Sequence, residues 1–142
     1  MCILTDFREL NKCIERETFP LPKISDLPLK LERFAHATAT DLSQGYCHVL
    51  LDEESQKLCA TTLPWGPCRH LSLPMGLANA PDIFQAAMAR CLDGLDCARA
   101  HIDDVLVTST GSCEDHLKKV EEVIKRLHDF RFRINLKSRA LL

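Results

Sequence analysis

The sequence predicts a two-layer α+β domain, with helices packed on one face of an antiparallel sheet. Short apolar runs bounded by turn residues predict strands near 37–42, 46–51 and 57–63. Two segments, near 81–91 and 113–130, have the apolar spacing of amphipathic helices. The length of 142 residues suits a single domain with one core.

The composition is that of an ordinary soluble globular domain, with 46% hydrophobic and 27% charged residues. We expect neither a membrane span nor secretion, because no apolar run approaches 18 residues and no signal-peptide pattern is present. None of the 8 cysteines forms a Cys-x-x-Cys pair, so a zinc site is not predicted. Reduced, mostly core-filling thiols are expected instead.

The net charge of −2 argues against strong non-specific binding to nucleic acid. Charge is uneven, however, because basic residues are concentrated near the C-terminus. A solvated face and a contact with backbone phosphate both remain open for them. These residues are Arg126, Arg131, Arg133, Lys137 and Arg139.

The first third of the chain is rich in proline and charge. Residues 19–22, Phe-Pro-Leu-Pro, predict extended chain, because proline fixes φ and disfavours helix in its predecessor. A short helix is possible from Ile24 to Phe34, although Pro28 interrupts it. In the strand predicted at 46–51, both alternating sets contain apolar residues, which suggests cover on both sides. Residues 64–67, Pro-Trp-Gly-Pro, predict a turn.

Two helices follow this turn. The first should carry Pro81 in its first turn, with Asn79 or Ala80 near the cap. Its predicted apolar face is Ile83, Phe84, Ala87, Met88 and Cys91. Residues 112–115 resemble a capping box with aspartate at the last position, and open a helix to about Phe130. Its predicted apolar stripe is Leu117, Val120, Ile124 and Leu127.

Between these helices lies the pair Asp103–Asp104, at a tight turn between two apolar runs. Aspartate is common in turns because its side chain bonds nearby backbone amides, so a purely structural role is open. The alternative is a site for a hard divalent cation, since Mg²⁺ prefers carboxylate oxygens. A third acid, Asp41, ends another apolar stretch and favours that alternative.

Several motifs occur in order along the chain. They are Asp41 with Gly45-Tyr46, the run Leu73–Pro81, and Ile102–Asp104, preceded by Asp6–Lys12 and Phe19–Ile24. Together they resemble the reverse transcriptases of gypsy-class LTR retrotransposons and their retroviral relatives. The resemblance implies the palm of a right-hand polymerase at 37–142, truncated before the thumb, and part of the fingers at 1–36.

The resemblance implies an RNA-directed DNA polymerase with Asp41, Asp103 and Asp104 as catalytic residues and metal ligands. Two Mg²⁺ or Mn²⁺ ions would stabilise the attacking and leaving oxygens of an in-line displacement. The backbone carbonyl of Leu42 would assist the ion on the triphosphate side. Clustered acids repel one another, so at least one pKa should rise when no metal is bound.

Nucleotide-binding residues are also implied. Tyr46 would pack against the sugar of the dNTP and exclude a 2′-hydroxyl, although a half-buried strand aromatic is an open alternative. Met75 and Gly76, within Leu73–Pro81, would line the nucleotide site. Gln85 occupies a family position, but an exposed helical glutamine fits it equally well.

Contacts with an RNA or DNA template and its primer would come from Arg8, Lys12, His101 and Lys137. A solvated surface is an open alternative for Arg8, Lys12 and Lys23. Asn135 and Lys137 lie in a segment that resembles a family motif after the second palm helix. The other implied partners are dNTP and the rest of a Pol polyprotein, namely thumb, RNase H and integrase. The resemblance implies an intracellular, cytoplasmic location, in a virus-like particle or the nucleus, without membrane contact.

The chain departs from the family pattern in several places. His101 replaces a tyrosine or phenylalanine that contacts the primer, and Cys2 replaces a triphosphate-binding arginine. Arg131 replaces a glycine that would take positive φ at a helix end, which predicts strain. Arg139 replaces a cysteine, and the sequence ends at Leu142, before a thumb. We therefore expect a fragment that polymerises weakly or not at all. A decayed or domesticated binding module and, with less support, a metal-dependent nuclease are the alternatives.

Overall fold

The computed structural model describes residues 5–16, 18–19 and 34–141, and only the backbone of 136–141. Its elements are α1 (Arg8–Cys13), β1 (His36–Leu42), the 3-10 helix η1 (Gly45–His48), α3 (Glu53–Leu58), β2 (Ala60–Leu63), β3 (Gly66–Arg69), α4 (Ala80–Cys91), β4 (Ala98–His101), β5 (Asp104–Ser109), α5 (Cys113–Asp129) and β6 (Ile134–Leu141). The helix predicted at 24–34 and the extended chain at 20–22 fall almost wholly outside the described residues.

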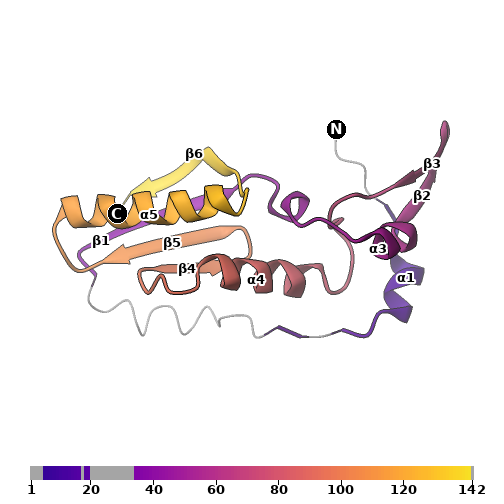
Figure 1. Cartoon of the computed structure of the whole chain (residues 1–142), viewed down its shortest axis with the longest axis horizontal. Coiled ribbons are helices and arrows are strands. Elements are labelled where there is room, and N and C mark those ends of the chain that lie inside the picture. The colour runs from indigo at the N-terminus through magenta and orange to yellow at the C-terminus, as the bar shows by residue number, and fades with distance from the viewer. Residues whose placement is uncertain (1–4, 17, 20–33, 142) are drawn as a thin grey trace.

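Four antiparallel strands form the main sheet in the order β4-β5-β1-β6. Helices α4 and α5 pack against this sheet, while α1, α3 and the β2–β3 hairpin lie at the other end of the molecule (Figure 1). The predicted two-layer α+β architecture is therefore confirmed. Its core lies between sheet and helices, where the side chains of Phe84, Met88, Val105 and Leu127 are at most 1% exposed.

Helix α4 agrees with the prediction. Asn79 is its N-cap, and Pro81 lies in the first turn, where the missing N–H costs nothing. Phe84, Met88 and Cys91 are completely buried, but Ile83 is 37% exposed and lies at the margin of the apolar face.

Helix α5 begins at the predicted capping box, in which Ser112 and Asp115 bond each other's backbone N–H. The predicted apolar stripe is wrong in part, because Leu117 and Ile124 are 54% and 44% exposed. The buried residues are His116, Val123 and Leu127. His116 is polar and falls outside the apolar pattern, yet Thr38 and Ser109 bond its ring in the core.

The strand predicted at 46–51 is wrong. Gln44 takes a left-handed φ of 54°, which turns the chain out of β1 and into η1. The strand predicted at 57–63 begins only at Ala60, because Asp52 caps α3 by accepting from Ser55 N at 2.8 Å. The turn predicted at 64–67 is present as the tip of the β2–β3 hairpin.

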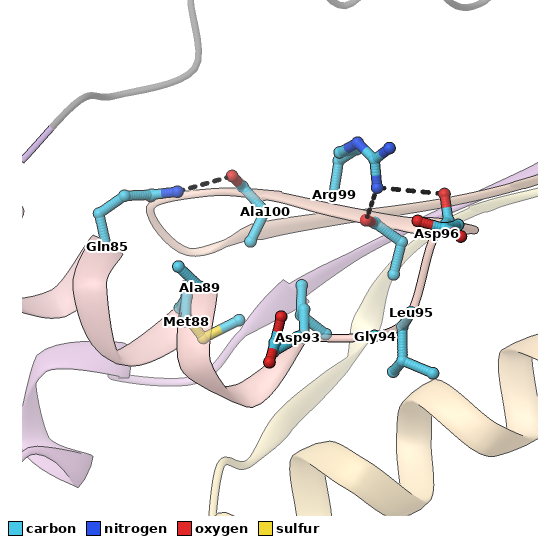
Figure 2. Close-up of a pocket in the computed structure, with 11 residues that line it drawn as sticks. Gln85, Met88, Ala89, Asp93, Gly94, Leu95, Asp96, Arg99 and Ala100 are labelled. Atoms are coloured by element: carbon cyan, nitrogen blue, oxygen red, sulfur yellow. Dashed lines mark hydrogen bonds between the residues drawn. The ribbon is translucent and has the colours of Figure 1, made fainter.

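Side chains bond the outer edge of β4, which pairs with no other described strand. Gln85 Nε2 donates to Ala100 O at 2.9 Å, and Arg99 donates to Ala98 O at 2.7 Å (Figure 2). Side chains bonded to these carbonyls hinder the pairing of a further strand with this edge. Within the described residues, β4 is an edge strand of the sheet, and it leads into the acidic turn.

The cysteines that the structure describes are free thiols. Of the described cysteines, only Cys59 and Cys91 are buried, and Cys13, Cys47 and Cys113 are exposed. The prediction that most cysteines fill the core is therefore wrong for this part of the chain. Within the described ranges, no helix has the length and apolar character needed to cross a membrane.

Candidate active site at the β1–β5 end of the sheet

Strand register brings the predicted acids together. Asp41 of β1 is paired directly with Asp104 of β5, and Asp104 is paired with His101 of β4. Paired residues of an antiparallel sheet share a face, and successive residues alternate between faces. Thr38 bonds α5, so Asp41, an odd number of residues away, projects from the face opposite the helices. Asp41 and Asp104 therefore lie side by side on the helix-free face.

Asp103 lies beside them in the two-residue turn between β4 and β5. Ile102, which precedes it, has a φ of 52°, although a β-branched residue rarely takes positive φ. Such strain persists only where neighbouring structure imposes it, and it is common at functional sites. One constraint is the bond from Leu42 N to Asp103 O at 2.9 Å, which ties the turn to the end of β1.

Gln85 supplies a second constraint on this turn. Its Oε1 accepts from Ile102 N at 2.8 Å while its Nε2 donates to Ala100 O. Figure 2 shows the side chain extending from α4 to the strand. Its exposure is only 3%, so the exposed helical glutamine left open by the sequence is excluded. Gln85 positions the backbone that carries the acidic pair.

The Asp103 carboxyl group lies in an unfavourable environment for charge. Burial, followed by the charges of Asp41 and Asp104, raises its pKa above the ordinary value, while His48 acts in the opposite direction. Its Oδ1 is buried and has no hydrogen-bond partner among the described residues. This agrees with the pKa rise expected for metal-free clustered acids.

Tyr46 is close to this carboxyl group, in η1 and not in the strand that was predicted. Its ring lies 5.1 Å from that of Phe84, centroid to centroid. Burial, then the charge of Asp103, raises the pKa of the Tyr46 hydroxyl. The phenol is thus within electrostatic range of the acid cluster.

Asn135 of β6 also joins the cluster, because its Nδ2 donates to Asp41 Oδ2 at 3.2 Å. A register shift in the β1–β6 pairing between Thr40 and Asp41 leaves Asn135 opposite Asp41. The sequence linked Asn135 to a family motif but assigned it no contact with an aspartate.

The Met75–Gly76 loop is held by α1. Asn11 donates from Nδ2 to Gly76 O at 2.8 Å and accepts at Oδ1 from Ala78 N at 2.9 Å. Gly76 has a φ of 104°, a conformation that favours glycine, and Met75 is 46% exposed. Sequence reasoning assigned Asn11 no role, although it lies within the Asp6–Lys12 motif.

Two of the side chains predicted to bind phosphate form ion pairs with carboxylates nearby in the sequence. Arg8 is paired with Asp6 at 2.6 Å, and Lys12 with Glu9 at 2.8 Å, all with exposed side chains. Lys23 and the side chain of Lys137 lie outside the described part of the chain. His101 is half-buried, and its Nδ1 has no hydrogen-bond partner among the described residues.

The acid cluster is not a preformed metal site. Within the described residues, no group of three or more His, Cys, Asp or Glu residues is arranged to hold a metal ion. The donor chemistry fits a hard divalent cation, because three carboxylates lie at the same end of the sheet and Asp103 Oδ1 has no hydrogen-bond partner among the described residues. The side chains would have to rearrange for joint coordination.

A family model described as "Reverse transcriptase (RNA-dependent DNA polymerase)" matches residues 1–141. The chain belongs to the reverse transcriptase family. This reverse transcriptase chain is 31% identical over 137 residues to the Pol polyprotein from transposon 297 of Drosophila melanogaster, covering 94% of the chain and 13% of that protein. It is 33% identical over 124 residues to the enzymatic polyprotein of figwort mosaic virus, covering 87% of the chain and 18% of that protein.

A solved structure shares the fold of this reverse transcriptase chain. The foamy viral protease-reverse transcriptase, in complex with an RNA/DNA hybrid, superposes with a TM-score of 0.83 and 26% identity. The match covers 96% of this chain and 19% of that one. The resemblance to reverse transcriptases, and the palm-like α+β fold that it implied, are confirmed.

Proposed function

We propose that this chain is the catalytic part of an RNA-directed DNA polymerase from a retroelement Pol polyprotein. Residues 37–142 are assigned to the palm and 1–36 to part of the fingers. The observation that carries the proposal is the pairing of Asp41 with Asp104, next to the strained turn that bears Asp103. A carboxylate cluster on a rigid sheet is what two-metal nucleotidyl transfer requires.

Asp41, Asp103 and Asp104 would hold two Mg²⁺ or Mn²⁺ ions, with help from the carbonyl of Leu42. When bound, the ions would stabilise charge on the oxygens of the reacting phosphate. The chain's own contribution is rigidity. Gln85 and Leu42 fix the turn backbone, so the acids are presented from one end of the sheet.

Substrate contacts are proposed for residues around this cluster. Tyr46 would exclude the 2′-hydroxyl of a nucleotide by steric contact, and Met75 and Gly76 would line the nucleotide site. His101, on the same sheet face as Asp104, would stack on the primer. Arg8, Lys12 and Lys137 would contact phosphates, which for Arg8 and Lys12 requires exchange of their present carboxylate partners.

The proposed partners are an RNA or DNA template with its primer, dNTP, and the remaining domains of a Pol polyprotein inside the cell. Affinity for a primer–template depends on many phosphate contacts, and the net charge of this chain is −2. We therefore expect the chain by itself to bind the duplex weakly and to synthesise little DNA.

A non-catalytic relic is the second candidate. It is favoured by the positive φ of 65° at Arg131, where the family has glycine, and by the replacement of the primer-contacting aromatic with His101. Such a module would retain the fold and bind nucleic acid without chemistry.

Extension of a labelled DNA primer on an RNA template, at low salt with Mg²⁺ or Mn²⁺, separates the two candidates. We expect short products from the wild-type chain that vanish in the Asp103→Asn/Asp104→Asn double variant. Products that survive in the double variant would exclude these acids as catalytic. Complete absence of products from wild-type chain that binds the duplex would favour the relic.

A further inference from the structure

Gly45 leaves a small space beside the acid cluster. A Cβ built at this position would overlap Asp103 Oδ1 and would lie 2.7 Å from Phe84 Cζ. Gly45 is not among the residues with positive φ, so the backbone does not require glycine. The requirement is for space, and the group that uses that space is the Asp103 carboxylate. We call this space, bounded by Gly45, Tyr46 and Phe84, the Gly45 niche.

The Gly45 niche is a poor place for a carboxylate. Phe84 is completely buried, and the Tyr46 and Phe84 rings lie 5.1 Å apart. Asp103 Oδ1 has no hydrogen-bond partner among the described residues, and an unpaired buried polar atom is destabilising. Repulsion from Asp41 and Asp104 on the adjoining strands opposes a closer approach of the Asp103 carboxylate to them.

The same position explains why the three acids do not form a ready metal site. An Asp103 Oδ1 turned towards Gly45 is not available to a cation shared with Asp41 and Asp104. The described residues accordingly include no group of three acids arranged around a common ion position.

We propose that the Gly45 niche holds the Asp103 carboxylate apart from Asp41 and Asp104 until a divalent cation binds. Coordination of an ion by Asp103 would require its carboxylate to leave the niche, so Gly45 would lower the affinity of the metal-free chain for the ion. The inference rests on the proposed role of these acids, and it adds a positioning role for Gly45.

Direct binding of Mn²⁺ to the purified chain, followed by the paramagnetic signal of the free ion, tests this without any activity measurement. Gly45→Ala should close the niche and leave Asp103 in the position that binds metal. We expect Mn²⁺ binding to tighten roughly fivefold to tenfold, as when a minor competent state becomes the main one. Adding Asp103→Asn to Gly45→Ala should cancel the gain.

Gly111→Ala is the matched control, because a Cβ there would lie 3.0 Å from the Asp115 carboxylate, which belongs to the α5 cap. Its Mn²⁺ affinity should equal that of the wild type. If the contact with Phe84 prevents Gly45→Ala from folding, the double variant Gly45→Ala/Phe84→Leu provides the missing room. Affinity at or below the wild-type level in a folded Gly45→Ala chain would overturn the proposal.

The wild-type chain provides an independent measurement. Tyr46 is its single tyrosine, so tyrosine labelled at the ring ζ-carbon yields one aromatic NMR signal beside the niche. Mg²⁺ should shift this signal in the wild type and not in Asp103→Asn. An unchanged signal at saturating Mg²⁺, or no metal binding with either residue at position 45, would also overturn the inference. Failure of primer extension alone would contradict the proposed polymerase function but not the proposed role of the Gly45 niche.

Discussion

Asp41 lies directly opposite Asp104 across the β1–β5 pair, on the sheet face that the helices leave open. Two like charges placed this way destabilise a sheet unless something offsets their repulsion. Asn135 supplies part of the compensation by donating to Asp41. The repulsion also acts on Asp103 at the adjacent turn, whose pKa is raised by burial and then by both of these charges.

Asp103→Asn should therefore stabilise the metal-free chain at neutral pH. When the pKa of an acid is higher in the folded than in the unfolded state, the free energy of unfolding falls as the pH rises from the unfolded-state pKa through the folded-state pKa. An asparagine cannot ionise, so the variant should melt a few degrees higher at pH 7 in chelator. The difference should disappear below pH 3.8, the ordinary pKa, where both states are protonated. Exposed Asp96→Asn is the control, and an equal gain there would contradict the assignment.

Gln85→Leu should loosen the acidic turn. The variant leaves Ile102 N and Ala100 O without partners at a site where Gln85 is 3% exposed. We expect a loss of about 1–3 kcal/mol in the free energy of unfolding. Hydrogen exchange at the Ile102 amide should also accelerate. Gln56→Leu, which removes the bond to Leu51 O far from the turn, should leave that amide unchanged. Unaltered exchange in Gln85→Leu would exclude the positioning role.

Acid should destabilise the chain through His116. Burial, then the charges of His36 and Lys119, lowers the pKa of this ring, which bonds Thr38 and Ser109 at 2.8 Å each. When the pKa of a base is lower in the folded state, the free energy of unfolding decreases as the pH falls below the ordinary pKa, which is 6.5 for this histidine. The melting temperature should decline from pH 7 to pH 5, and His116→Gln should flatten this decline. Exposed His128→Gln should not, and the same slope in all three proteins would refute the assignment.

Arg131→Gly should stabilise the end of α5. Arg131 N donates to His128 O and Phe132 N to Leu127 O, a Schellman motif that requires left-handed φ at its central residue. Arg131 takes that conformation, with φ at 65°, as the sequence predicted for this position. Glycine should add about 1 kcal/mol to the free energy of unfolding, because it carries no Cβ penalty there. Arg131→Ala, which keeps the Cβ, should show no gain in a denaturant titration.

Local patterns in the sequence were sufficient for several elements. Pro81 and the apolar spacing behind it predicted α4, and Ser112 with Asp115 predicted the start of α5. The apolar runs around Asp103–Asp104 predicted the β4–β5 hairpin. Each of these elements is specified by residues close together in the sequence, so a local pattern is enough to predict it.

The missed features have two causes, a local backbone conformation in one case and partners far apart in the chain in the other. Residues 46–51 have the alternation of a strand, but the left-handed Gln44 converts their start into a 3-10 turn. The buried stripe of α5 includes His116 because hydroxyls from two strands happen to reach both ring nitrogens. No pattern within α5 specifies those hydroxyls.

The sequence alone determined the family, the α+β class, and the chemical identity of the three acids, because these depend on residue type and order. Only the tertiary structure decided that Asp41 faces Asp104, that Gln85 is buried against the turn, and that Asp103 occupies the Gly45 niche. The reason is physical. Strand register, burial and side-chain position are fixed by contacts between segments far apart in the chain, and a linear pattern carries no record of which segments will meet.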